Sequence, residues 1–169
     1  MKKISKIINL VSVLFLLILI SSCSSISTQN QLINQYEMKA VQYRIARPTN
    51  NLKEVVSFYK NALGLEVIGS FENHEGYDGV MLGLPDKTYH LEFTQHIDKL
   101  PLPEPTKENL LIFYYDSPQE YEKVIKKFTQ LGLEPVEPEN PYWKNKSTTY
   151  EDPDKWRIVL FNGVYTPYK

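Results

Sequence analysis

Two stretches of the chain place apolar residues three or four positions apart, the spacing of a helix that buries one face. The first runs from about Asn51 to Ala62 and the second from Pro118 to Leu131. The letters Leu-Gly-Leu-Glu follow the first at 63–66 and recur at 131–134, an offset of 68 residues. In both copies the glycine stands where a helix C-cap needs a positive φ. We therefore predict two helices that end in the same way.

Short strand-like segments recur at nearly the same offset, one before each helix and three after it. The predicted strands are 41–46, 67–71, 79–84 and 89–94 in the first half, and 109–114, 134–136, 147–150 and 157–161 in the second. Each half is then β-α-β-β-β, and the halves are joined by a proline-rich connector at 100–105. One helix covers only one face of a four-stranded sheet. We therefore expect an α+β domain over 40–162, with modules at about 40–97 and 107–162 that pair, form a mixed sheet and enclose a cleft. Residues 163–169 form a tail.

The N-terminus has a different pattern. Three lysines, at positions 2, 3 and 6, precede an apolar run from Ile7 to Ile20. This is the pattern of an export signal. The run has 14 residues, whereas a membrane-spanning helix needs about 20. The single cysteine, Cys23, follows the run, and one cysteine forms neither an intramolecular disulfide nor a thiolate zinc site.

Residues 20–23, Ile-Ser-Ser-Cys, resemble the lipobox of bacterial lipoproteins. The resemblance implies that residues 1–22 are a signal peptide and that Cys23 carries acyl chains such as palmitate. Each buried CH₂ contributes roughly 0.8 kcal/mol, so these chains would hold the protein on the extracytoplasmic side of the cell membrane or outer membrane. Residues 23–39 then form the lipidated cysteine and a polar tether. An uncleaved N-terminal anchor helix is the alternative.

Composition narrows the functional class. Hydrophobic residues make up 42% and charged residues 23% of the 169 positions, which are ordinary globular values. The 19 basic and 20 acidic side chains nearly cancel, so a nucleic-acid partner bound through phosphate neutralisation is not expected. The sequence contains no nucleophile elbow, phosphate loop or dinucleotide fingerprint.

Three segments of the domain resemble the vicinal oxygen chelate superfamily, which includes glyoxalase I, fosfomycin and bleomycin resistance proteins and extradiol dioxygenases. The segments are FYKNALGL at 58–65, YHLEF at 89–93 and DPDKWRI at 152–158. The resemblance covers residues 40–162 and implies the paired β-α-β-β-β architecture. Because members often pair halves between chains, it also allows a homodimer.

The resemblance further implies a divalent metal bound by the first and last strands of each half. The matching positions hold Gln42, Glu92, Leu110 and either Val159 or Leu160. Leucine and valine cannot bind a metal, and glutamine is at best a weak neutral ligand. Only Glu92 keeps a strong ligand type, so a divalent metal is not favoured and the cofactor stays unassigned.

All three histidines lie within 23 positions, beside the same half-sheet. His90, Glu92 and His96 share one face of their strand, because side chains alternate along it, and His74 lies near Tyr77 in a preceding loop. Three interpretations stay open. His74, His90, Glu92 and His96 could supply a relocated metal site. Alternatively, His90 and Glu92 form a metal-free pair that acts as general acid and base or holds a polar ligand. In the third, these side chains are structural.

Both halves contribute further candidates to the cleft. Arg44 could face Glu92 or an anionic ligand, Trp143 offers aromatic surface, and Arg47 beside Pro48 reads as a loop or rim residue. The hypothesis is a membrane-anchored protein whose cleft binds a small organic molecule through the following residues: Glu92 and His90 as catalytic centre, with His74, Tyr77, His96, Arg44 and Trp143 around them. It would act as a glyoxalase-like lyase or isomerase by proton transfer. A sequestering protein of the bleomycin-resistance type and a surface interaction scaffold are the alternatives.

Overall fold

The computed structural model describes residues 42–83 and 89–167. The predicted signal peptide, Cys23 and the tether as far as residue 39 lie outside the described residues, so the anchor stays a prediction. Within the two described ranges, no helix has the length and apolar character needed to cross a membrane.

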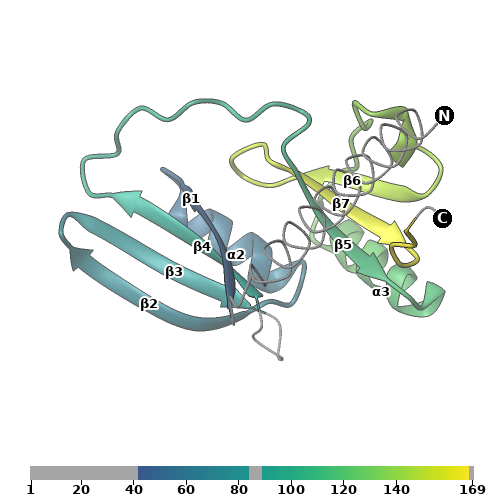
Figure 1. Ribbon diagram of the computed structural model, residues 1–169, viewed down its shortest axis with the longest axis horizontal. Helices are drawn as coiled ribbons and strands as arrows, with labels where there is room; N and C mark the ends of the chain where they lie inside the picture. The colour runs from purple at the N-terminus through teal and green to yellow at the C-terminus, as the bar shows by residue number, and fades with distance from the viewer. Residues whose placement is uncertain (1–41, 84–88, 168–169) are drawn as a thin grey trace, which may run out of the picture. The chain divides into compact units, whose positions relative to one another are not determined.

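The first module is built around a four-stranded sheet, here called sheet A (Figure 1). Its elements are β1 (Tyr43–Pro48), α2 (Leu52–Asn61), β2 (Glu66–His74), β3 (Tyr77–Gly83) and β4 (Tyr89–His96). The strand order is β1-β4-β3-β2; β1 runs parallel to β4, and the other neighbours are antiparallel. The predicted β-α-β-β-β module is confirmed, with β2, β3 and β4 extended by two or more residues at one end.

The second module repeats this order around sheet B. Its elements are β5 (Leu110–Tyr115), α3 (Pro118–Gln130), the short 3-10 helix η1 (Pro141–Trp143), β6 (Ser147–Glu151) and β7 (Arg157–Asn162). The strand order is β5-β7-β6, with β5 parallel to β7. The described strands thus form two mixed sheets rather than one continuous sheet.

One predicted strand, 134–136, was wrong in extent. Of these residues only Val136 pairs, in a single antiparallel bridge to Thr149 on β6. Pro135, inside the predicted strand, has no N–H to donate to a ladder, and Pro138 follows closely. The strand predicted between α3 and β6 is therefore reduced to one bridge.

Both helices end as the repeat predicted. Gly64 and Gly132 have φ values of +74° and +72°, which only glycine adopts without strain. The start of α3 is capped by Ser117, whose side chain accepts a hydrogen bond from the backbone N–H of Glu120, and proline occupies the first turn. Leu131, expected on the apolar stripe of this helix, is instead 48% exposed because it lies at the C-cap, beyond the last buried turn.

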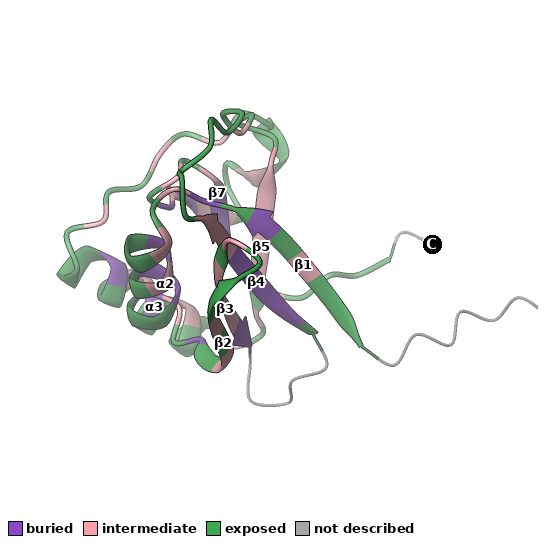
Figure 2. Cartoon of the chain, turned by 90° about the vertical axis from the view of Figure 1, so that its left-hand side faces the viewer, coloured by how far each residue is buried: buried purple, intermediate pink, exposed green. Residues whose placement is uncertain are grey.

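A single core joins the two modules. Phe58 of α2 and Phe128 of α3 meet edge to face with ring centroids 5.8 Å apart. In sheet A the core contains Leu91 and Phe93 of β4, and β4 and β7 are the strands with the longest buried runs (Figure 2). Since neighbouring side chains on a strand point to opposite sides, the even-numbered positions of β4 lie on the face away from α2. That face carries the candidate site.

Candidate functional site

The parallel pairing of β1 and β4 brings three of the predicted residues together. Arg44 lies opposite His90 in the ladder, and Glu92 is two residues further along β4. The Nε atom of Arg44 donates to Nε2 of His90 at 2.8 Å, and its Nη1 donates to Oε2 of Glu92, also at 2.8 Å. The relative exposures are 4% for His90 and 8% for Glu92, whereas the side chain of Arg44 is 48% exposed. The half-exposed side chain of Arg44 thus binds two buried side chains.

These contacts assign the tautomer of the neutral His90 ring. A guanidinium only donates hydrogen bonds, so Nε2 of His90 must be the ring nitrogen without a proton. In the neutral ring the proton is then on Nδ1. Nδ1 is buried and has no hydrogen-bond partner among the described residues. His90 therefore presents a donor that the described residues leave unused.

Apolar side chains lie on the same face of sheet A. Met81 is the neighbour of Glu92 across β3 and β4, and it lies so close over Gly69 that a Cβ there would be 2.7 Å from its Cε. In the same way the ring of Phe71 covers Gly79, where a Cβ would collide with it. The two glycines let these side chains lie flat on the sheet. The polar group is thus bordered by a thioether and an aromatic ring.

The structure places the other histidines elsewhere. His96 pairs with Tyr77 at the far end of β4, with ring centroids 4.8 Å apart, and its Nδ1 accepts from the backbone N–H of Asp98. His74 is exposed at the β2–β3 turn, where it pairs with Tyr77. Six residues of strand, or about 20 Å, separate His90 from His96. The predicted cluster is therefore two groups: one around His90, and one formed by His74, Tyr77 and His96.

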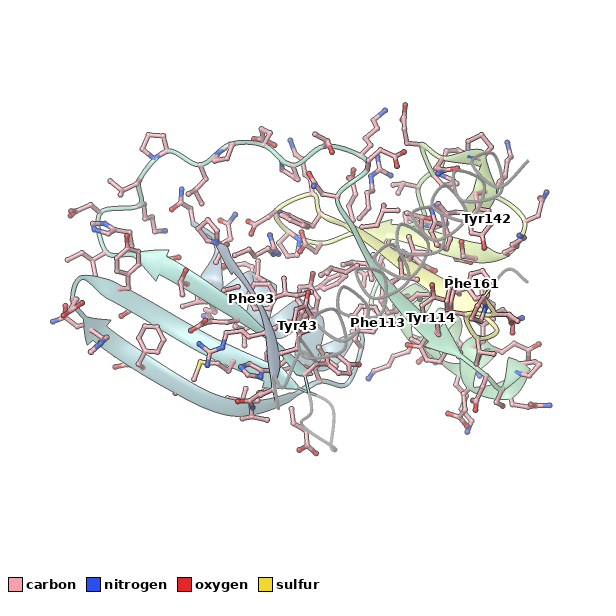
Figure 3. The ribbon with its side chains drawn as sticks, in the orientation of Figure 1. Tyr43, Phe93, Phe113, Tyr114, Tyr142 and Phe161 are labelled. Carbon is pink, nitrogen blue, oxygen red and sulfur yellow. The ribbon has the colours of Figure 1, made fainter. Side chains whose placement is uncertain are left out.

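Trp143 belongs to the second module. Its ring packs against those of Phe161 and Tyr142, with centroids 6.1 Å and 4.8 Å away, and its backbone oxygen accepts from Ser147. Figure 3 labels Phe161, Tyr142 and Tyr114 of this aromatic group together with Tyr43 and Phe93 of sheet A. These ring and backbone contacts of Trp143 are all with residues of its own module.

The residues present do not fit the metal site that the fold implies. Glu92 is bound to Arg44, and Leu110 has no donor atom. The structure also decides which residue matches the ligand position on the last strand. Leu160 lies in the core, so Val159 occupies the opposite face of β7. In residues 42–83 and 89–167, no three His, Cys, Asp or Glu side chains are grouped as a metal would require. Of the four residues predicted for a relocated metal site, only His90 and Glu92 lie side by side.

Sequence reasoning missed a buried arginine on β1 and its ion-pair network. Arg47, expected at a loop or rim, is 6% exposed on β1 and forms ion pairs with Asp152 and Asp154 of the second module. Its guanidinium lies 4.9 Å from the ring centroid of Phe93 and 5.0 Å from that of Trp156, although its buried Nε has no hydrogen-bond partner within residues 42–83 and 89–167. The signal available in the sequence was the segment 152–156, DPDKW, whose two aspartates need a cation.

The acceptor of this network is strongly desolvated. Burial raises the pKa of Asp152, and the Arg47 guanidinium opposes that rise. The Tyr59 hydroxyl donates to Oδ2 of Asp152 at 2.9 Å, and burial raises the pKa of this tyrosine well above its ordinary value. The network ties β1 and α2 to the loop before β7. Its contacts are internal, which indicates a structural role.

Comparison with known proteins decides the family. Residues 43–94 match the YycE-like N-terminal domain and residues 108–162 the YycE-like C-terminal domain. Protein YycE of Bacillus subtilis is 49% identical over 125 residues, which cover 74% of this chain and 90% of the relative. The chain belongs to the YycE family. A crystal structure of a YycE protein of unknown function from Bacillus subtilis matches with a TM-score of 0.73 and 47% identity, over 78% of this chain and 96% of that one.

More distant structures match this YycE-family domain in fold. Glyoxalase I of Leishmania major has a TM-score of 0.57 at 17% identity, over 75% of this chain and 88% of its own. The fosfomycin resistance protein FosX of Mesorhizobium loti has a TM-score of 0.57 at 14% identity, over 76% and 94%. The predicted glyoxalase-like fold of the vicinal oxygen chelate type is confirmed.

Proposed function

We propose that this YycE-family protein binds a small organic molecule on the face of sheet A that carries Arg44, His90 and Glu92. The observation that carries the proposal is the buried Nδ1 of His90, a donor without a partner among the described residues. Leaving such a group unsatisfied costs about 1–3 kcal/mol, and a ligand acceptor that displaces the side chains covering it would recover part of that cost. The fold is shared with a glyoxalase and a fosfomycin resistance protein, which supports a small molecule as the ligand.

The contacts around His90 also define the ligand's chemistry. It needs a hydrogen-bond acceptor for the Nδ1 proton, and the exposed part of the Arg44 guanidinium favours an oxygen acceptor. Phe71 and Met81 on the same face offer an apolar surface for the remainder of the molecule. A compact molecule with an oxygen at one end and an apolar body meets both conditions.

Binding without turnover fits this arrangement better than proton transfer does. Arg44 occupies the lone pair of His90 Nε2 and one oxygen of Glu92, so His90 cannot act as a base through Nε2 while Arg44 stays in place. The half-exposed Arg44 side chain favours a second candidate: once it turns into solvent, it releases Nε2 and Glu92 for general acid and base work in a lyase or isomerase. The proposed site does not include the other residues predicted from the sequence, which are His74, Tyr77, His96 and Trp143.

A thermal-shift screen of oxygen-bearing small molecules on the purified protein tests the site. A ligand at 100 times its Kd adds about 2.7 kcal/mol to stability, which gives a clear shift. His90→Phe and Glu92→Gln should each lose the shift, and His74→Ala is the matched control that should keep it. If hits persist in both variants, the site is wrong. A shift lost in His74→Ala would extend it to the β2–β3 turn.

Incubation of each hit with the protein, followed by proton NMR of the ligand, separates binding from turnover. Unchanged ligand at stoichiometric occupancy supports sequestration. Conversion that depends on His90 and Glu92, and survives in Arg44→Met, supports the lyase or isomerase.

We further propose that acyl chains on Cys23 hold the domain on the extracytoplasmic side of a membrane. The lipobox-like residues 20–23 and the short apolar run before them support this anchor. Mass spectrometry of the N-terminus of protein isolated from its native membrane should find residues 1–22 removed and diacylglyceryl and acyl groups on Cys23. An intact leader with a free thiol would contradict the anchor.

A homodimer is the remaining partner proposal. The strands β1 and β5 each end a sheet, and Tyr43 and Tyr114 on them are 63% and 42% exposed. Light scattering during size-exclusion chromatography should give twice the chain mass. The chain mass alone would remove the proposal.

A further inference from the structure

A second candidate site lies on the opposite side of β1 and β4 from His90. It is a cavity of about 570 Å³ between sheet A and the edge strand of sheet B. Ile45, Leu82 and Leu91 form one wall, Leu63 and Leu65 after α2 form another, and all six residues of β5 complete it. Figure 3 labels Phe113 and Tyr114 of that strand. Its volume is in the range of small-molecule sites, roughly 300–1,000 Å³.

Alternation along the strands separates this cavity from the first site. Ile45 follows Arg44 on β1, and Leu91 lies between His90 and Glu92 on β4. The side chains of Ile45 and Leu91 therefore point away from the buried Nδ1. A ligand on one face does not touch the side chains of the other, so each site can be changed alone.

The described part of the lining favours an uncharged occupant. None of the described residues that line the cavity carries a charged side chain. An ion placed there would lose its hydration without gaining an oppositely charged partner among these residues. The polar groups of the lining are backbone and the phenols of Tyr89, Tyr114 and Tyr115.

Tyr115 is the suitable hydrogen-bond donor, because it shares with Leu111 and Phe113 the face of β5 that packs against the core, whereas Tyr114 is 42% exposed. Tyr115 is half-buried, and burial together with the neighbouring Tyr89 raises its pKa to about 12. The phenol therefore keeps its proton at every physiological pH and can donate to a neutral oxygen acceptor.

We propose that this cavity is a second binding site, which takes an uncharged apolar molecule with one ketone-like or ether-like oxygen that accepts a hydrogen bond from Tyr115. The apolar walls set the body of the ligand and the phenol sets its single polar end. The site is distinct from that of the proposed function and does not depend on it.

Benzophenone is a probe of this chemistry, because it is uncharged, apolar and carries one ketone oxygen. On irradiation it forms covalent bonds with nearby C–H groups, so peptide mass spectrometry of the labelled full chain reports where it was bound. We expect the label on peptides that contain residues 110–115 and Ile45 or Leu91. The anionic 4-benzoylbenzoate should label the same peptides at least tenfold less.

The internal repeat supplies a matched pair of variants for the walls. Leu63→Trp fills the cavity and should abolish labelling, whereas Leu131→Trp, at the same position of the second Leu-Gly-Leu-Glu, should leave it unchanged. Tyr115→Phe keeps the wall and should reduce labelling about fivefold, the effect of one lost hydrogen bond. Tyr165→Phe, 66% exposed, is its control.

Three results would overturn the proposal. Label spread over peptides outside the cavity, equal labelling by the neutral and anionic probes, or equal labelling of wild type and Tyr115→Phe would each do so. A thermal melt of each variant identifies any that fails to fold, and Tyr115→Phe, the most conservative, decides in that case. His90→Phe should label like wild type, so failure here and failure of the first site are distinguishable.

Discussion

Two arginines three residues apart on β1 serve different purposes. Arg47 is 6% exposed and pairs with two aspartates of the other module, between two aromatic rings. Arg44 has a 48% exposed side chain and holds His90 and Glu92 within its own sheet. An odd number of positions separates them, so they lie on opposite faces of the strand. Arg47 faces the core and Arg44 the face away from α2.

The two arginines differ as a structural charge differs from a charge at a binding site. The Arg47 network joins the two modules through buried charges, so its loss would weaken the contact between them. The Arg44 group joins only neighbouring strands that already pair through their backbones, and it contains a buried donor that has no partner in the described part of the chain. Stability should therefore respond strongly to the first group and weakly to the second, while ligand binding should respond only to the second.

The largest effect is expected from Asp152→Ala. It leaves Arg47 buried with one carboxylate fewer and removes the acceptor of Tyr59, so the free energy of unfolding should fall by about 3–5 kcal/mol. Urea unfolding followed by tyrosine and tryptophan fluorescence measures it. Glu104→Ala breaks the exposed pair with Lys155 and should change stability by under about 0.5 kcal/mol. Equal effects would show that the network is not structural.

A smaller effect is expected from breaking the Arg44 group. Arg44→Met should cost about 1 kcal/mol, because Glu92 loses its partner but water reaches this half-exposed position. A double-mutant cycle with Glu92→Gln isolates the pair, and the coupling energy should be about 1 kcal/mol. A coupling above about 3 kcal/mol would place this group with the structural charges and erase the contrast with Arg47.

The fold was predictable because its repeat is local. Helix periodicity, the two glycines and the strand alternation each depend on neighbours in sequence, and all three survive in the structure. The prediction of a strand at 134–136 was wrong for an equally local reason, which the sequence already contains. Pro135 has no N–H to donate to a ladder.

The candidate site was only partly predictable. The parity of Arg44, His90 and Glu92 placed them on one face, and the structure brings them into contact. The separation of His74 and His96 from His90 follows from strand length, which proximity in sequence does not reveal. The depth of Arg47 depends on Asp152, 105 residues away, and the apolar cavity depends on two strands from different modules. Such pairings are set by tertiary packing and not by pattern.

Of the changes in the two arginine groups, His90→Phe is expected to have the smallest effect on stability, and it tests the contrast most directly. The change removes the Nε2 atom that accepts a hydrogen bond from Arg44, whose guanidinium can then bind water. It also removes the buried Nδ1 donor, which has no partner among the described residues. These terms oppose each other, so the free energy of unfolding should change by less than about 1 kcal/mol. Ligand-induced thermal shifts should disappear in the same variant.

A residue whose loss costs little stability but all binding belongs to the site rather than to the scaffold. Tyr59→Phe is the control on the other network. It removes a hydrogen bond to the buried Asp152 and should lower stability by about 1.5–3 kcal/mol while leaving ligand shifts intact. If His90→Phe instead destabilised the domain as much as Tyr59→Phe does, the donor on Nδ1 would have a structural partner, and the two arginines of β1 would serve the same purpose.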